Sequence, residues 1–160
     1  MATEIDEVYS LMVPTIRGNI LLPNSNVAEI VPFSNVTLFA EPEGKPAWFL
    51  GHLYWRGQEV PLVSIDVIRG EHDPQANKRS RVAVAHTLNQ NKELPYIAIV
   101  VQGIPRLSHV NSDNMKFVQQ EVLSDAVKVQ VTVDDIEAAI PDLDKLEEMV
   151  TSARATQAID

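Results

Sequence analysis

Short apolar runs, each closed by proline, glycine, asparagine or aspartate, recur along most of the 160-residue chain and favour a β-dominated fold. The clearest run places Val127, Val129, Val131 and Val133 in alternation with polar residues. Because successive side chains of a strand point to opposite faces, this alternation gives one apolar sheet face. Further runs lie at 8–13, 20–22, 27–31, 49–55, 60–65, 81–88, 96–101 and 136–140. No crossover helices separate them, so the sequence predicts a barrel or sandwich instead of a parallel α/β sheet.

The apolar spacing becomes helical only near the C-terminus. Three apolar residues there fall at i, i+3 and i+7, which is one stripe of a helix: Leu143, Leu146 and Val150. Asp144, followed three residues later by Glu147, matches a capping box, so we expect the helix to begin near Asp144. The residues after Ala153 are small and polar, and we expect 151–160 to form a short frayed tail.

Three polar stretches interrupt the predicted strands. Residues 41–46 contain two prolines and a glycine and predict a loop. Residues 70–81 form a longer polar connector that divides the runs into two halves of similar size. Residues 111–123 are ambiguous, because their few apolar residues have near-helical spacing in a mostly polar segment.

The charge balance excludes several classes of partner. Lys and Arg total 13 and Asp and Glu total 22, which gives a net charge of −9. Binding to nucleic acid or to an anionic membrane surface requires a basic patch, and the chain has no basic surplus to form one. The most apolar run, 94–101, is far shorter than the roughly 20 residues that span a bilayer, and the N-terminus is acidic where a signal peptide is basic. We therefore expect a soluble, cytoplasmic protein that does not insert into membranes.

No motif for catalysis or cofactor binding is found. There is no cysteine, which removes thiolate zinc sites and cysteine nucleophiles. None of the four histidines stands in an H-E-x-x-H pair, and neither a G-x-S-x-G elbow nor a glycine-rich phosphate loop is present. Seven carboxylates gather between residues 134 and 148, but without the glycine of a calcium loop they read as a solvated acidic face. The sequence predicts no enzyme, no metal and no cofactor.

One predicted hairpin stands out by its composition. Arg56 precedes Gly57 in the turn between the runs 49–55 and 60–65, and four of the nine aromatic residues lie close by: Trp48, Phe49, Tyr54 and Trp55. Core packing is one explanation for the aromatic residues. The other is a protein interface, where aromatic residues and arginine are enriched.

Residues 51–66 of this hairpin, Gly-His-Leu-Tyr-Trp-Arg-Gly-Gln-Glu-Val-Pro-Leu-Val-Ser-Ile-Asp, resemble the central motif of CheW-like chemotaxis coupling proteins. Residues 20–23 and 27–31, the latter containing Glu29, are similar to the family's first-strand return and its Val-x-Glu-Ile segment. Residues 140–146 are similar to its closing strand and helix entry. The resemblance covers residues 7–150 as a single domain. Tyr54 and Trp55 stand where the family usually has a small polar residue and an aliphatic one, and Gln102 stands about where it often has Asp.

The resemblance implies an all-β fold of two interlocked five-stranded SH3-like β-barrel subdomains with a C-terminal helix. It also implies a non-enzymatic adaptor that couples the cytoplasmic signalling tip of chemoreceptors to the regulatory domain of a histidine kinase. The partner-binding residues by this resemblance are Glu29, Trp55, Arg56 and Gly57. The opening residues and the divergent second half are most similar to the ChpC-type adaptors of pilus and twitching-motility systems. At 160 residues, we expect a stand-alone adaptor without kinase or receiver domains.

Two alternatives stay open at this point. Arg56 either anchors a partner while Trp55 and its apolar neighbours form a dry surface patch, or it pairs with a nearby carboxylate and only holds the hairpin together. The competing function is a β-barrel module that binds a small molecule or peptide in a cavity.

Overall fold

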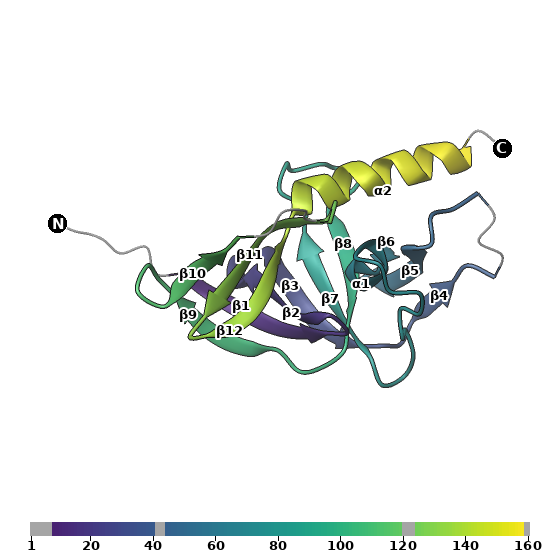
Figure 1. Cartoon of the computed structure of the whole chain (residues 1–160). Coiled ribbons are helices and arrows are strands. Elements are labelled where there is room, and N and C mark those ends of the chain that lie inside the picture. Colours follow the sequence, from purple (N-terminus) through teal and green to yellow (C-terminus); the bar gives the residue numbers. More distant parts are fainter. Residues whose placement is uncertain (1–7, 41–43, 120–123, 159–160) are drawn as a thin grey trace.

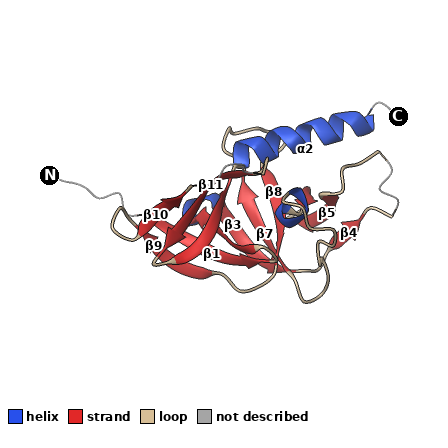
Figure 2. Ribbon diagram, viewed as in Figure 1, coloured by secondary structure: helices blue, strands red, loops and turns tan. Residues whose placement is uncertain are grey.

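The strands form two six-stranded sheets with one long helix lying along them (Figures 1 and 2). This computed structural model describes residues 8–40, 44–119 and 124–158. Sheet A has the order β10-β11-β12-β2-β1-β9, and sheet B has the order β3-β7-β8-β6-β5-β4. The strands of sheet A are β1 (Val8–Thr15), β2 (Gly18–Pro23), β9 (Arg106–Val110), β10 (Met115–Val118), β11 (Val127–Val133) and β12 (Ile136–Pro141). Those of sheet B are β3 (Val27–Pro32), β4 (Val36–Leu38), β5 (Phe49–Trp55), β6 (Gln58–Val63), β7 (Arg81–His86) and β8 (Tyr96–Val101).

The two sheets are interleaved in sequence. Strands β1 and β2 belong to sheet A, β3 to β8 form sheet B, and β9 to β12 belong to sheet A again. The purple N-terminal strands therefore lie beside the green C-terminal ones in Figure 1. A short parallel pairing joins the two ends, with Asn19 opposite Ala138 and Ile20 opposite Ala139. The connector at 70–81 falls inside the sequence of sheet B, so the sheets do not correspond to the two halves of the chain.

The all-β fold class with a C-terminal helix is confirmed, although each sheet has six strands where the resemblance implies five. Three strands were not predicted from the sequence: β4, β9 and β10, the last of which lies within the ambiguous segment 111–123. All three lie at sheet edges, where side chains such as Leu107 and Phe117 stay exposed and no apolar face is needed. The acidic residues 1–7, residues 41–43 of the predicted loop, residues 120–123 and the last two residues of the predicted tail lie outside the described residues.

Helix α2 (Leu143–Ala158) contributes to a central core that both sheets share. Its predicted apolar stripe of Leu143, Leu146 and Val150 is buried against residues of both sheets. The helix begins at Leu143, close to the predicted start, but its cap is Asp142, two residues before the predicted Asp144. Oδ1 of Asp142 accepts a hydrogen bond from the backbone N–H of Lys145 at 3.0 Å. The helix also continues to Ala158, where the sequence predicts fraying after Ala153, and in Figure 2 its C-terminal end reaches out beyond the strands.

A second helix, the single-turn α1 (Ile65–Ile68), follows β6 and begins at the last residue of the predicted run 60–65. The hydroxyl of Ser64 caps it by accepting a hydrogen bond from the N–H of Val67 at 3.1 Å. This turn directs Asp66, which is only 2% exposed, toward the β1–β2 turn. The two carboxylate oxygens of Asp66 accept hydrogen bonds from the N–H groups of Ile16 and Arg17, both at 3.1 Å. Asp66 therefore ties sheet B to sheet A.

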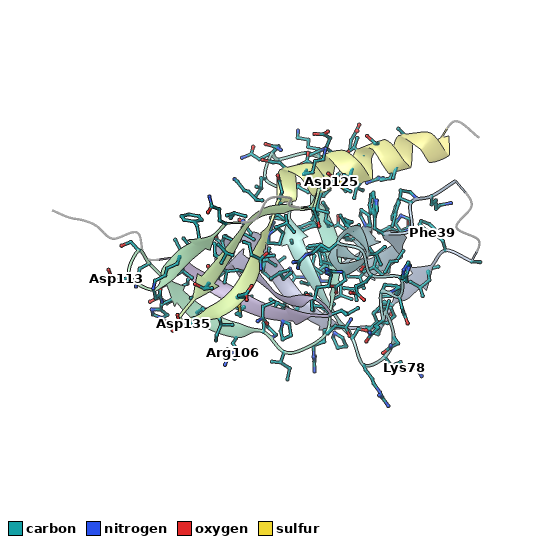
Figure 3. The ribbon with its side chains drawn as sticks, in the orientation of Figure 1. Phe39, Lys78, Arg106, Asp113, Asp125 and Asp135 are labelled. Atoms are coloured by element: carbon teal, nitrogen blue, oxygen red, sulfur yellow. The ribbon has the colours of Figure 1, made fainter. Side chains whose placement is uncertain are left out.

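The loop after β4 and the turns of sheet A lie at opposite ends of the molecule. Figure 3 shows Phe39, which follows β4, at one end, and Asp113 and Asp135, from turns of sheet A, at the other. Within the described part of the chain, no helix is both long enough and apolar enough to span a membrane.

Candidate protein interaction site at the β5–β6 hairpin

The β5–β6 turn holds Arg56 at the surface in a fixed backbone conformation. Trp55 pairs with Gln58, which leaves Arg56 and Gly57 as a two-residue turn. Both have positive φ, 48° for Arg56 and 79° for Gly57, as a type I′ turn requires. Glycine adopts this conformation without strain, whereas arginine does so at some cost. A Cβ at Gly57 would meet nothing within 4 Å, so its contribution is conformational.

Glu29, on strand β3, is the acceptor that joins this hairpin to the opposite side of the sheet. Its Oε1 accepts a hydrogen bond from the indole Nε1–H of Trp55 at 3.0 Å and another from Nη2 of Arg56 at 3.3 Å. Three strands separate β3 from β5 in the sheet order, so sheet B curls until these two strands approach each other. The structure thus brings together all four residues proposed as partner-binding: Glu29, Trp55, Arg56 and Gly57.

Of the two explanations that the sequence leaves open for the aromatic residues, core packing holds for Trp55, which does not form a surface patch. It is 7% exposed and packs with buried residues of sheet B. Its ring meets Tyr96 edge-on with centroids 4.8 Å apart, and the guanidinium carbon of Arg56 lies 4.6 Å from the centre of the Trp55 ring. The aromatic residue of this hairpin that faces solvent is Tyr54, at 54% exposure.

The arrangement is suited to recognition. The side chain of Arg56 is 65% exposed and that of Glu29 is 44% exposed, so solvent screens their ion pair and it contributes about 0–1 kcal/mol. A guanidinium has five N–H donors, and the hydrogen bond to Glu29 occupies only one Arg56 nitrogen. Among the described residues, Glu29 is the hydrogen-bond partner of this guanidinium, so the remaining donors are available to a binding partner.

Sequence reasoning missed Tyr96 as a member of this cluster. Tyr96 begins strand β8, where it contacts Trp55 and also lies 5.1 Å from His86, measured between ring centroids. The run 96–101 identified the strand, but no local signal indicates that its first residue meets the hairpin. This contact depends on the order of strands in sheet B.

Outside this hairpin, the described residues form a hollow and a histidine site with a lowered pKa, but no cluster of metal ligands. No group of three or more His, Cys, Asp or Glu side chains suitable for a metal occurs among the described residues. A hollow of about 510 Å³ lies between the loop at 44–48 and α2, lined by Lys45, Trp48, Lys145 and Met149 among others. Burial lowers the pKa of His52, whose ring contacts Phe39 and Phe49, and the nearby charges of Arg154 and Lys45 lower it further, against the opposing effect of Glu59.

The two interleaved sheets and the C-terminal helix form a fold that is shared with a solved CheW structure. The solved structure of the scaffolding protein TtCheW from Thermoanaerobacter tengcongensis matches the chain with a TM-score of 0.66 at 16% identity, over 86% of this chain and 90% of that one. The family model for the CheW-like domain matches residues 10–150, so the chain belongs to the CheW-like domain family. No curated protein sequence matches the chain significantly.

Proposed function

We propose that this chain is a non-enzymatic, cytoplasmic adaptor that couples chemoreceptors to a histidine kinase. The observation that carries the proposal is the CheW-like domain itself, which spans residues 10–150. The partners are the regulatory domain of the kinase and the cytoplasmic signalling tip of the receptor. The finer proposal is a ChpC-type adaptor in a pilus or twitching-motility system, and the sequence resemblance alone supports it.

Within this function, Arg56 is the contact residue of the β5–β6 hairpin. Its exposed, permanently charged side chain stands on a rigid two-residue turn, and a rigid anchor loses little conformational freedom on binding. Glu29 and Gly57 support it, Glu29 through the ion pair and Gly57 through the turn conformation.

The test measures binding of Arg56→Ala to the regulatory domain of the histidine kinase from the same genome, and to a soluble fragment of a receptor tip. We expect the melting temperature to fall by only a few degrees, because the lost ion pair is exposed. Affinity should fall roughly 5- to 150-fold, corresponding to about 1–3 kcal/mol for a significant anchor. The matched control is Arg79→Ala, an exposed arginine in the connector, which should bind normally. If Arg56→Ala binds both partners normally, the assignment of Arg56 is wrong, and if the unmodified chain binds neither, the adaptor function is wrong.

The competing function, a module for a small molecule or peptide, rests on the hollow of about 510 Å³ beside α2. A saturable thermal shift produced by a small molecule, and abolished by Trp48→Ala, would favour it over the adaptor.

A further inference from the structure

We infer that Trp55 is the positioning residue of this interface: it fixes Glu29 by hydrogen bonding and Arg56 by stacking, and makes no contact with the partner itself. This inference rests on the proposed function, because it explains how the contact residue Arg56 is held ready. Trp55 is the buried member of the cluster. Its indole N–H donates to Glu29, and the face of its ring contacts the guanidinium of Arg56.

The two bonds to Glu29 are unequal. The donor of the first is the indole of Trp55, which is 7% exposed, and its N···O distance is 3.0 Å. The donor of the second is Arg56, whose side chain is 65% exposed, at 3.3 Å. Water competes for the exposed donor much more than for the buried one, and screening weakens an exposed ion pair. The position of Glu29 therefore depends mainly on Trp55.

The indole itself has little freedom. Tyr96 packs against it edge-on at 4.8 Å, and the surrounding apolar side chains of sheet B enclose it. Above it, the guanidinium of Arg56 lies 4.6 Å from the ring centre, within the range of a cation–π contact. Trp55 thus forms a rigid base on which the exposed side chain of Arg56 is oriented.

This arrangement has a consequence for binding. When Arg56 turns its donors toward a partner, Glu29 does not have to move, because the indole N–H still holds its carboxylate. The carboxylate then remains beside the guanidinium as a fixed counter-charge, and less conformational freedom is lost when the complex forms.

The first experiment needs no partner and follows the indole N–H signals in a ¹H–¹⁵N correlation spectrum. The chain has two tryptophans, so Trp48→Phe removes one signal and assigns the other to Trp55. In Glu29→Ala, the Trp55 signal should shift and its proton should exchange with water at least severalfold faster. In Arg56→Ala, exchange should stay within about twofold of the unmodified chain. An unchanged Trp55 proton in Glu29→Ala would overturn the inference.

The second experiment measures affinity for the kinase regulatory domain in a double-mutant cycle. Trp55→Phe keeps an aromatic ring but removes the N–H donor, and should weaken binding severalfold, whereas Trp48→Phe serves as the matched control. Because Trp55 acts through Arg56, the double variant Trp55→Phe/Arg56→Ala should bind no more weakly than Arg56→Ala alone. If the two losses multiply, Trp55 has an independent or merely structural effect and the inference is wrong. A normal affinity for Arg56→Ala would instead refute the proposed contact role, while the indole measurements still decide the positioning role.

Discussion

Removing the carboxylate of Asp66 should destabilise the whole molecule, because this side chain joins the two sheets. Asp66 is 2% exposed, and it accepts hydrogen bonds from the N–H groups of Ile16 and Arg17 at 3.1 Å each. A hydrogen bond to a charged group contributes about 1.5–3 kcal/mol. Two are lost in Asp66→Ala, and because Arg17 is exposed and Ile16 only half-buried we take the lower end, about 3 kcal/mol.

Electrostatic interactions also predict that loss of the Asp66 carboxylate destabilises the fold. Burial lowers the pKa of Arg69, the neighbouring charge of Arg17 lowers it further, and Asp66 raises it. Without Asp66, the half-buried Arg69 guanidinium would therefore face Arg17 with no compensating charge from this residue. Asp66→Asn keeps one acceptor oxygen but loses the charge, so it should be destabilised less than Asp66→Ala.

Thermal and urea denaturation, followed by circular dichroism, measure the effect. For a chain of this size, about 2–4 °C of melting temperature corresponds to 1 kcal/mol. Asp66→Ala should therefore melt about 6–12 °C lower than the unmodified chain. The control is Glu71→Gln, which breaks an exposed ion pair with the same Arg17 at 3.3 Å and should cost less than about 1 kcal/mol. If Asp66→Ala melts no lower than Glu71→Gln, the junction does not stabilise the fold as argued.

Three further outcomes are expected. Gly51→Ala should destabilise strongly or prevent folding, since a Cβ at Gly51 would lie 2.0 Å from the carbonyl oxygen of Thr37. The control is Gly57→Ala, which has open space around it and should cost only backbone strain. Equal melting temperatures for the two variants would contradict this. Asp142→Ala should lower stability by about 1 kcal/mol through loss of the α2 cap, and a larger effect from Asp144→Ala would restore the capping-box prediction. The pKa of His52 is lower in the folded chain than its ordinary 6.5, so folding favours the neutral imidazole. Stability from this residue is present above pH 6.5 and is lost as the pH falls toward the folded pKa; His52→Gln should flatten that part of the pH–stability curve, and an unchanged curve would show that another group is responsible.

The sequence predicted those elements that bury a regular apolar face. The alternation at 127–133 identified β11, and the stripe of Leu143, Leu146 and Val150 identified α2, because burial imposes the period of each element. The edge strands β9 and β10 bury little and carry no such period. The start of α2 near Asp144 was predicted, but its cap was not: the pattern pointed to Asp144, whereas the side chain of Asp142 accepts the capping hydrogen bond from the N–H of Lys145.

The sequence predicted which residues form the candidate site but not the contacts between them. The hairpin motif placed Arg56 and Gly57 in a turn, and the resemblance added Glu29. No local signal indicated that the indole of Trp55 would be buried with its N–H directed at Glu29, because that contact forms only when sheet B curls and β3 approaches β5. The division of strands between the sheets was missed for a similar reason, since it depends on pairings between distant residues such as Ile20 and Ala139.

The return of the chain from sheet B to sheet A has a consequence for the order of folding. Sheet B consists of consecutive strands from residue 27 to residue 101, so its pairings close comparatively short loops. The β1–β2 hairpin is made first during synthesis, yet β2 gains its neighbour β12 only after residue 136 has been added. Until then the edge of β2 is unpaired and open to association with other chains. Pairings of such long sequence separation slow folding, and completion of sheet A is therefore expected to limit the rate at which the native protein forms.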